Sequence, residues 1–477
     1  MKTAERKALL QHFAELRSDT ESSPPAVKTF LPVAAHARAL QREVVVVLGV
    51  KGAGKSALFR FATESPKDVT AMYGAEVPHA TWLDGYSEKI PHPQAVALMD
   101  LVAADEGNDE LLRSFWLVYL VNRLAENRQV AALVPAELQA LWGNPDASPV
   151  AWAQGAASKS WQLTSALDRI EGFLAERKSL TFVAYDALDK LGDLQLAMRA
   201  RFVRSLLALW LSLSNRYHWL RPKIFLRHDL FEAAQRSFPD ATKLVARSQS
   251  LDWSVDDLFT LVARHLANNT GAAVQQARGW LKEVVGCELD AKGDLGFMPG
   301  RFDEDLRRHF GAALAGEVMG SGVKKGYTYR WIAARLQDAD RRIVPRSLLR
   351  LLSFAAAAAL GNVLAKGDAL MRPTDLSGAL ARTSLDRGAE LAEEVPLVSR
   401  LQRLEGLTLL LPRREVEVRL AKRAGPTDTF VEDGAAAIEE LQRLGVLAIR
   451  PDGRVDVPDI YRYGYKIKRK GGVRKPR

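Results

Sequence analysis

The sequence has little of what marks membrane, secreted or metal-cluster proteins. It holds a single cysteine, Cys287, which excludes an intrachain disulfide and a metal cluster built from cysteines. No run of eighteen apolar residues is present, and the first residues are polar with charges of both signs, so the sequence predicts neither a membrane span nor a secretory signal. We therefore expect a cytoplasmic protein without a membrane partner, in which Cys287 is a small core side chain.

Apolar residues and basic charge are abundant instead. The chain has 477 residues, of which 47% are hydrophobic, and this length leaves room for about two to four domains. Its 67 Lys and Arg exceed its 57 Asp and Glu, giving a formal net charge of +10. Such an excess favours an anionic partner, and nucleic acid is a better candidate than a membrane surface.

The strongest motif lies in residues 43–56, where an apolar run passes directly into a glycine-rich loop. Residues 49–56 fill the pattern G-x-x-x-x-G-K-[ST], behind four valines and a leucine that supply a buried strand. Gly49, Gly52 and Gly54 permit a close approach of backbone N–H groups to a phosphate. The segment therefore predicts a strand, a phosphate loop and a helix that begins near Lys55.

The remaining positions of this loop have predicted roles toward ATP and Mg²⁺. Lys55 would neutralise the β- and γ-phosphates, the hydroxyl of Ser56 would coordinate Mg²⁺, and Ala53 would contribute backbone to the cradle. A chance glycine turn before a helix is the alternative, but the strand in front and the amphipathic helix behind argue against it. Just before the strand, where many P-loop ATPases contact adenine, His36 is a candidate; a surface histidine on a short helix explains it equally well.

A second anchor is the apolar stretch from residue 180, which ends in Asp186. It looks like a Walker B element, whose carboxylate lies beside Mg²⁺ at the carboxyl end of a strand next to the loop. Asp186 is therefore the candidate on the metal side. The usual catalytic glutamate would follow directly, but the chain has Ala187 there. Either Asp189 polarises the attacking water, or hydrolysis is slow and the protein is a nucleotide switch.

A third strand is predicted at residues 221–226 and ends at Arg227. This arginine could sense the γ-phosphate in its own subunit or reach a neighbouring subunit as an arginine finger. An exposed turn with a salt bridge is the alternative. Between the loop and Asp186, residues 111–124 predict a buried helix in which Trp116 and Tyr119 are core residues rather than nucleic-acid stacking platforms. Strands that alternate with helices predict a parallel sheet covered on both faces.

Beyond about residue 265 strand signals are absent up to the C-terminal region, and helical patterns fill the sequence. One of these helices opens with Pro345 and places Arg346 in its first turn. Near the C-terminus a helix at residues 434–444 precedes two short strands around the turn 451–453, which is the outline of a winged helix.

The chain ends in a basic tail, residues 461–477, with eight basic residues, no acid and three tyrosines. Basic charge interleaved with aromatic rings fits phosphate contact plus base or sugar stacking, and a solvated tail that binds nothing specific is the alternative. The candidate nucleic-acid contacts are Lys466, Lys468, Arg469, Lys470 and Arg474. The predicted domains are an N-terminal helix and linker (1–28), a P-loop ATPase core (29–265), a helical lid (266–394) and a winged helix with the basic tail (395–477).

The phosphate loop, the strand that ends at Asp186, the strand that ends at Arg227 and the Pro345-Arg346 pair together resemble AAA+-related bacterial ATPases of the STAND and KAP kind. The order of core, lid and winged helix is also similar to origin-recognition-type initiators. In AAA+ ATPases a Pro-Arg pair at the start of a lid helix is the second sensor, so the resemblance implies that Arg346 is directed at the γ-phosphate. The chain departs from the pattern at Ala187 and in having Arg227 where an uncharged polar sensor is usual.

The resemblance implies an ATP-binding and hydrolysing switch that forms homo-oligomers and acts on nucleic acid through its winged helix and tail. The alternative is a STAND-type antiphage-defence signalling ATPase whose lid and C-terminal domain bind a protein trigger or effector. A small-molecule kinase is a distant third, because no residues define an acceptor pocket.

Overall fold

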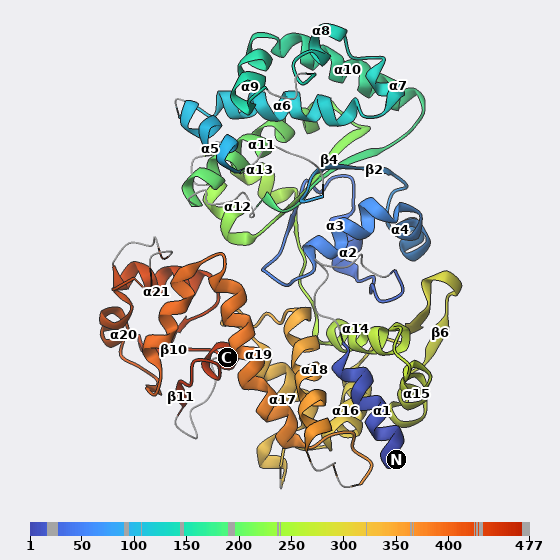
Figure 1. Cartoon of the computed structure of the whole chain (residues 1–477), viewed down its shortest axis with the longest axis vertical. Helices are drawn as coiled ribbons and strands as arrows, with labels where there is room; N and C mark the ends of the chain where they lie inside the picture. The colour runs from blue at the N-terminus through green and yellow to red at the C-terminus, as the bar shows by residue number, and fades with distance from the viewer. Residues whose placement is uncertain are drawn as a thin grey trace. The chain divides into compact units, whose positions relative to one another are not determined.

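The chain forms two compact units (Figure 1). Unit 1 comprises residues 1–31, 51–53 and 252–477, and unit 2 comprises residues 32–50 and 54–251. The structure, a computed structural model, describes all residues except 17–26, 90–94, 106, 144–146, 189–195, 236–237, 239, 321, 363–364, 366, 424, 426–427, 429–432 and 470–477. No helix among the described residues is long and apolar enough to cross a membrane.

Unit 2 is built on a five-stranded sheet with the strand order β2-β3-β4-β1-β5. All neighbouring strands in it are parallel. The strands are β1 (Val46–Leu48), β2 (Thr81–Tyr86), β3 (Thr181–Tyr185), β4 (Leu220–Leu226) and β5 (Ser248–Ser250). Every residue of β1, β3 and β4 is buried, as expected for the inner strands of a parallel sheet.

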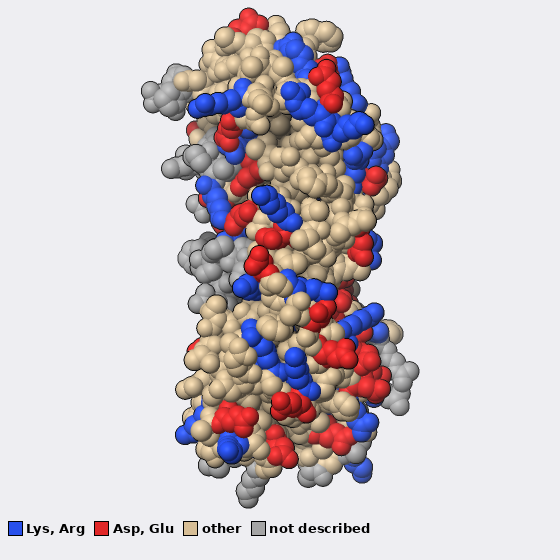
Figure 2. Space-filling model, turned by 90° about the vertical axis from the view of Figure 1, so that its right-hand side faces the viewer, with Lys and Arg blue, Asp and Glu red and all other residues tan. Residues whose placement is uncertain are grey.

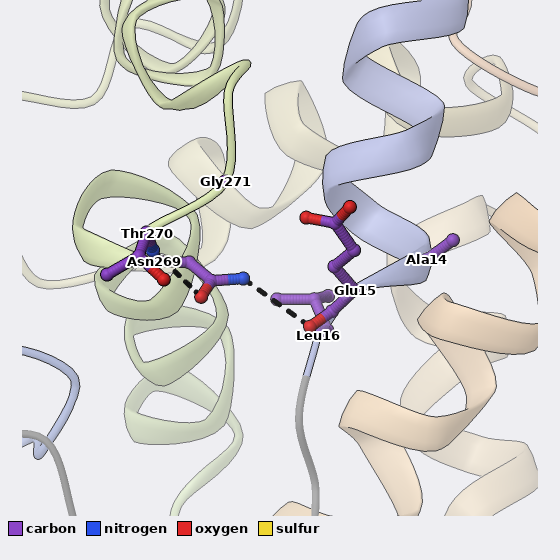
Figure 3. Close-up of a pocket in the computed structure, with 6 residues that line it drawn as sticks. All are labelled: Ala14, Glu15, Leu16, Asn269, Thr270 and Gly271. Atoms are coloured by element: carbon purple, nitrogen blue, oxygen red, sulfur yellow. Dashed lines mark hydrogen bonds between the residues drawn. The ribbon is translucent and has the colours of Figure 1, made fainter.

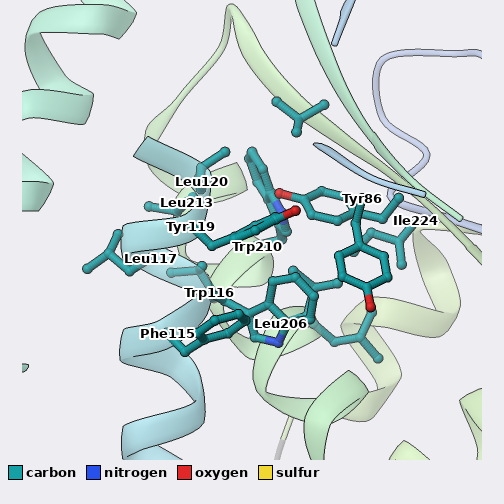
Figure 4. Packing of buried hydrophobic residues seen from close by; sticks show 14 of the residues in the cluster. Tyr86, Phe115, Trp116, Leu117, Tyr119, Leu120, Leu206, Trp210, Leu213 and Ile224 are labelled. Atoms are coloured by element: carbon teal, nitrogen blue, oxygen red, sulfur yellow. The ribbon is translucent and has the colours of Figure 1, made fainter. Parts of the chain in front are cut away.

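Helices cover both faces of this sheet, because successive residues of a strand point to opposite sides. On one face, Phe225 of β4 packs edge-on against Phe59 of α3 (Lys55–Glu64), with ring centroids 5.7 Å apart. On the other face, Ile224 joins a core contributed largely by α6 (Glu110–Leu124) and α11 (Leu196–Arg216) (Figure 4). The predicted α/β architecture with a parallel sheet and helices on both faces is confirmed.

Aromatic rings fill the core between α6, α11 and the sheet (Figure 4). Trp116 is fully buried, its ring lies 4.5 Å from that of Phe202, and its indole N–H donates to the Phe202 carbonyl at 3.0 Å. It also meets the rings of Tyr86 and Tyr185 edge-on. Burial of each such side chain contributes roughly 1.5–3 kcal/mol, so Trp116 and Tyr119 are core residues as predicted.

Two strands of the sheet, β2 and β5, were not predicted. Asp84 and Gly85 interrupt the apolar pattern of β2, and β5 is the polar tripeptide Ser-Gln-Ser.

Most of the remaining helices of unit 2 lie between β2 and β3 in the sequence. The remaining helices are α2 (Ala34–Ala39), α4 (Pro66–Tyr73), α5 (Ala95–Ala104), α7 (Arg128–Ala131), α8 (Ala136–Gln139), α9 (Pro149–Ser158), α10 (Ser160–Glu176), α12 (His228–Gln235) and α13 (Ala241–Ala246).

Unit 1 is mainly helical and includes the N-terminal helix α1 (Thr3–Ala14). In Figure 1, α1 (blue) lies beside α18 (orange, Pro345–Gly361), where the Ser353 hydroxyl donates to the Ala14 carbonyl at 2.7 Å. Phe13 packs edge-on against Trp280 at 5.6 Å. The other helices here are α14 (Val255–Asn268), α15 (Val274–Gly279) continued by a π-helical segment (Trp280–Val285), α16 (Glu304–Ala315), α17 (Thr328–Leu336) and α19 (Pro373–Ala392).

A hairpin of β6 (Leu289–Ala291) and β7 (Phe297–Pro299) interrupts these helices, so the expectation of a strand-free region was wrong. The fully buried Arg264 of α14 holds it. Its guanidinium donates to the carbonyls of Leu295 at 2.6 Å, Phe297 at 2.5 Å and Phe30 at 3.2 Å. An arginine that binds backbone carbonyls leaves no period-two apolar pattern, which explains why the sequence did not predict the hairpin.

The C-terminal region has the predicted winged-helix arrangement. The antiparallel pair β9 and β10 follows helix α21, and Leu411 forms an antiparallel bridge to Val455 of β10. Its elements are a 3₁₀ segment (Pro396–Leu404), β8 (Thr408–Leu409), α20 (Arg413–Leu420), α21 (Gly434–Arg443), β9 (Ala448–Ile449), β10 (Val455–Asp456), α22 (Asp459–Arg462) and β11 (Lys468–Arg469). The first part of the predicted tail is thus ordered, since β11 pairs in parallel with β8.

Candidate nucleotide site

The phosphate loop leaves β1 and enters α3 through two glycines in left-handed conformations. Gly52 has φ +82° and Gly54, the residue that caps α3, has φ +95°, a region that side-chain-bearing residues rarely adopt. Gly49 donates its N–H to the Leu226 carbonyl of β4 at 3.1 Å, which fixes the start of the loop to the sheet. Lys55 is the first residue of α3, as predicted.

The side chain of Lys55 folds back over its own loop. Its Nζ donates to the carbonyls of Gly49 at 3.0 Å and Val50 at 3.3 Å, while Ser56 follows in the first turn of α3. The N-terminus of a helix carries a partial positive charge and unpaired N–H groups. A lysine, a hydroxyl and such a helix end together form an arrangement that suits a phosphate group.

Asp186 is buried directly after β3, and its N–H donates to the Tyr86 carbonyl at 2.8 Å. The strand is not next to β1 as expected, because β4 lies between them. The Ser56 hydroxyl and the Asp186 carboxylate are oxygen donors of the kind Mg²⁺ accepts alongside water and phosphate. Within the described ranges no group of three or more His, Cys, Asp or Glu side chains forms a protein-only metal site. Asp189 lies outside the described residues.

A second carboxylate near the same edge of the sheet escaped the sequence analysis. Asp84 lies near the end of β2, in register with Ala184 of β3. Burial raises the pKa of Asp84, although the Ser87 hydroxyl donates to its Oδ2 at 2.6 Å. Arg123 donates to the Asp84 carbonyl at 3.0 Å and orders this turn. The sequence signal for this site is an aspartate that follows the apolar pair Trp82-Leu83. It can be recognised only once β2 is known to be a strand.

Arg227 is buried and forms a two-pronged ion pair with Asp229. Its Nε and Nη2 donate to the two carboxylate oxygens at 2.9 and 2.6 Å. The salt bridge of the alternative interpretation is therefore present, but in a buried turn rather than an exposed one. In this conformation the guanidinium is directed to its own chain, so a role as a finger toward a neighbour would require the pair to open.

His36 lies on the short helix α2 and is only 2% exposed, which contradicts the alternative of a surface histidine. The C-terminal end of α2 is closed by Lys223 of β4. This fully buried lysine donates to the carbonyls of Ala39 at 3.0 Å, Val44 at 2.6 Å and Gln41. Burial holds the pKa of Lys223 well below its ordinary value. The segment that carries His36 is thereby fixed to the central strand.

Loop residues 51–53 belong to unit 1 and are held by its helices. Lys51 Nζ forms ion pairs with Glu394 at 2.7 Å and Glu393 at 3.1 Å, at the end of α19. Arg387 of the same helix donates to the Lys51 carbonyl at 2.8 Å. The indole N–H of Trp253 donates to the Ala53 carbonyl at 2.8 Å. None of these partners was identified from the sequence.

Arg346 is the second residue of α18, directly behind Pro345, as predicted. It is not an ordinary exposed arginine, since its side chain is 15% exposed and forms an ion pair with Glu390 of α19. A Cβ added to Gly52 would lie 3.5 Å from the Cβ of Arg346 and 3.6 Å from Nη1 of Arg387. Burial acts to raise the pKa of Glu390, but Arg387 and Arg346 outweigh it and hold that pKa below its ordinary value.

The predicted nucleic-acid residues do not form one exposed strip. Lys468 is exposed, and the exposed Lys466 forms an ion pair with Glu405 at 3.1 Å. Arg469, predicted as a nucleic-acid contact, is turned inward, where it donates to Asp456 at 2.5 Å and to the Val457 carbonyl at 3.0 Å. Lys470 and Arg474 lie outside the described residues.

Charges elsewhere in the C-terminal region also differ from the expectation. Tyr461 is buried and cannot stack on a base in this conformation, and α21, the helix before the hairpin, exposes the acidic Glu439. Figure 2 shows another face of the molecule, the right-hand side of Figure 1, where acidic and basic side chains are interspersed. Helix α20 and the residues after it do expose a basic set that the sequence analysis missed: Arg414, Arg419, Lys422 and Arg423.

A cavity of about 450 Å³ lies away from these groups, at the end of α1 (Figure 3). The Asn269 side-chain amide donates to the Glu15 carbonyl there at 3.4 Å. No phosphate-loop residue lines the cavity, and the chain continues from Leu16 into residues 17–26, which the structure does not describe. Its lining is Ala14, Glu15, Leu16, Asn269, Thr270 and Gly271.

No protein-family model and no curated protein matches the chain. Among solved structures, it is similar to the Aeropyrum pernix ORC2 protein in ADPNP–ADP complexes, with 13% identity over 94% of this chain and 98% of that chain and a TM-score of 0.32. It is also similar to the Aeropyrum pernix ORC1 protein in complex with DNA, with 14% identity over 96% of this chain and 91% of that chain and a TM-score of 0.33. Its similarity to Cdc6p from Pyrobaculum aerophilum has 11% identity over 89% of this chain and 86% of that chain, with a TM-score of 0.28.

Likenesses with TM-scores this low carry no argument about function. The fold rests instead on the strands, helices and loop described above. The chain combines a parallel α/β unit that carries a phosphate-loop motif with a mainly helical unit that ends in a winged helix.

Proposed function

We propose that this protein is an AAA+-like switch that binds and hydrolyses ATP. The observation that carries the proposal is the passage from β1 through Gly52 and Gly54, both with positive φ, into α3 with Lys55 at its first position. This backbone can place N–H groups around a β-phosphate, and Lys55 can exchange its two carbonyl partners for phosphate oxygens.

Ser56 and Asp186 are the residues that would hold Mg²⁺ in this site. Bound there, the ion offsets the negative charge that develops on the phosphates during transfer. Asp186 is fixed for this role by its backbone hydrogen bond to β2. Because Ala187 replaces the usual acid, we assign the orientation of the attacking water to Asp189, with Asp84 as the second carboxylate to test. Slow turnover follows from either assignment, since neither acid directly follows Asp186.

Recognition of the third phosphate is assigned to Arg346. Its helix begins beside Gly52, and the guanidinium already serves one anionic partner, Glu390. A γ-phosphate is a stronger anionic acceptor than a carboxylate and accepts two parallel N–H bonds from an arginine. ATP would therefore be distinguished from ADP on this side of the loop. Arg227 keeps a supporting role within its own chain, as long as it remains paired with Asp229.

The output of the switch is assigned to the winged helix, acting on nucleic acid in a homo-oligomer. The exposed basic residues Arg414, Arg419, Lys422 and Arg423, with Lys468, supply the charge that phosphate contacts require.

A protein trigger or effector in place of nucleic acid is the second candidate. It is favoured by one observation: the exposed acid Glu439 on the helix before the hairpin, where a nucleic-acid reader would carry basic residues.

Calorimetry with Mg-ATP and Mg-ADP on the full chain tests the nucleotide assignment. We expect both nucleotides to bind. A titration in which neither nucleotide binds would overturn the proposal. Titration of the full chain onto single- and double-stranded oligonucleotides at two salt concentrations tests the output. The Arg414→Ala/Lys422→Ala double variant should lose about tenfold in affinity with a shallower salt slope. Equal oligonucleotide affinity for this variant and the parent would favour the protein-partner candidate.

A further inference from the structure

Three carboxylates at the end of α19 pair with one cation of the phosphate loop and with two arginines, one on α18 and one on α19 itself. Glu390 lies in the last turn of α19, Glu393 is the residue that caps the helix, and Glu394 follows it. That end carries partial negative charge and disfavours further anions. Carboxylates placed there need cations, and they find them in Lys51 of the loop, Arg346 and Arg387.

The ion pairs of this network are largely shielded from water. The side chains of Glu390 and Arg387 are 7% and 6% exposed, and those of Lys51 and Glu394 are 14% and 13% exposed. Glu393 differs, because 72% of its side chain is exposed. Shielded charge pairs interact more strongly than exposed ones, and loss of one partner leaves an uncompensated charge. We therefore expect Glu390 and Glu394, rather than Glu393, to determine the state of the loop.

The cations of the network are the ones nearest to Gly52. Arg387 donates to the Lys51 carbonyl at 2.8 Å, and the Cβ of Arg346 would lie 3.5 Å from a Cβ added to Gly52. Each cation thus has a carboxylate where a nucleotide would offer phosphate oxygens. Carboxylate and phosphate are interchangeable partners for arginine, although phosphate carries more charge and more acceptor oxygens.

We propose that Glu390 and Glu394 act as an internal phosphate substitute, which holds residues 51–53 in the nucleotide-free arrangement until a nucleoside triphosphate displaces Glu390 from Arg346. This inference rests on the proposed function. The exchange leaves no buried carboxylate without a partner, because Arg387 stays paired with Glu390 at 3.2 Å. A nucleoside diphosphate lacks the group that competes for Arg346, so it leaves the pair closed.

The same helix also seats the C-terminal segment. The Gly464 N–H donates to the Ser384 hydroxyl at 2.7 Å, and a Cβ on Gly388 would come within 2.6 Å of the Tyr465 hydroxyl. Gly388 lies next to Arg387 in the sequence. Burial acts to lower the pKa of Arg387, but the neighbouring Tyr461 and Glu390 outweigh it and raise that pKa. A shift of α19 on release of Arg346 therefore changes the contacts of residues 461–465. Opening of the Arg346–Glu390 pair is in this way coupled to the winged-helix region.

The test is calorimetry of the full-length Glu390→Gln variant with Mg-ATP and Mg-ADP. We expect ATP to bind about tenfold more tightly, the ratio that corresponds to one charge-assisted hydrogen bond no longer lost on binding, and ADP affinity to stay unchanged. Glu393→Gln is the matched control, since it removes the same charge from the same helix end at an exposed position, and its ATP affinity should stay within about twofold of the parent. In an Arg346→Ala background, Glu390→Gln should have no effect on ATP affinity.

Unchanged or weaker ATP binding by a folded Glu390→Gln variant would overturn the phosphate-substitute proposal while leaving nucleotide binding by the parent intact. Failure of the parent chain to bind ATP would overturn the proposed function as well. If Glu390→Gln does not fold by thermal melting, Glu394→Gln replaces it. Hydrogen exchange of residues 51–53 should then be faster than in the parent without nucleotide, and equal protection would overturn the proposal.

Discussion

In unit 2, Lys55 donates to the carbonyls of Gly49 and Val50, whereas in unit 1 Lys51 meets the carboxylates of Glu393 and Glu394. The same contrast extends beyond the loop, because Lys223 of the sheet has carbonyl partners and Arg346 of the lid has Glu390. Carbonyls of the main chain are fixed by the fold, but carboxylates on helix ends can be replaced by another anion. On the proposed function, we call the carbonyl-held part a rigid half that would bind any nucleotide, and the carboxylate-held part an exchangeable half that would read the third phosphate.

Removal of the lysine from the rigid half should have the largest effect. Lys55→Ala removes the charge that faces the phosphates common to ATP and ADP, so we expect both affinities to fall about a hundredfold or more in calorimetry. Lys67→Ala, an exposed lysine on α4, is the matched control and should bind as the parent does. Equal affinities of the parent and Lys55→Ala would contradict the assignment of phosphate binding to Lys55.

The next test separates binding from chemistry on the sheet side. Asp186→Asn keeps the shape and the backbone hydrogen bond but removes the carboxylate, so we expect Mg²⁺-dependent phosphate release to fall about a thousandfold while nucleotide affinity changes less than about tenfold. Asp84→Asn and Asp189→Asn in the same assay decide which second acid orients water. Wild-type turnover in Asp189→Asn would remove that residue from the mechanism.

On the exchangeable side, the expected effect is smaller and selective. Arg346→Ala should weaken ATP about tenfold and leave ADP unchanged, because only ATP carries the group assigned to this arginine. Competition between the two nucleotides in one titration measures the ratio directly. If the affinities for ATP and ADP fall equally, Arg346 contributes to general nucleotide binding or to the stability of the fold. It would then not distinguish ATP from ADP.

The last test concerns a pH dependence in unit 1. Burial raises the pKa of Asp338 to about 6 from an ordinary value near 3.8, so the folded state binds the proton more tightly than the unfolded state. This contribution to stability is complete below about pH 4 and is lost as the pH rises through about 6. Asp338→Asn should therefore gain up to about 3 kcal/mol relative to the parent at pH 7 and much less at pH 4, as measured by urea unfolding. An equal gain at both pH values would contradict this origin.

The sequence predicted the rigid half of the site well, because its geometry depends on residues that are neighbours in the sequence. Gly49, Gly54 and Lys55 require only a strand before them and a helix after them, and the structure has both. The partners of the exchangeable half were beyond sequence reasoning. Glu390 pairs with Arg346 across 44 positions of sequence, and nothing in the local pattern of α19 distinguishes it from other acids on a helix surface.

Contacts of two candidate arginines differ in how far the sequence could predict them. Arg227 pairs with Asp229, two residues away, whereas Arg469 pairs with Asp456, which only the tertiary fold brings beside it. The strands β2, β5 and β6 lack the apolar runs by which strands are predicted, and β7 has only three apolar residues, of which the last is a proline. Buried polar anchors are invisible to methods that depend on hydrophobic periodicity.

The position of α1 has a consequence for synthesis on the ribosome. The Ala14 carbonyl accepts its hydrogen bond from Ser353, a residue 339 positions later in the chain. At about 5–20 residues per second, the apolar face of α1 would wait roughly 20–70 s for α18 to be translated. During this time Leu9, Leu10 and Phe13, all buried in the finished protein, lack the cover of α18, although Trp280, which packs against Phe13, is translated earlier. Unit 1 therefore matures only near the end of translation, and its first helix is the segment that a chaperone would meet first.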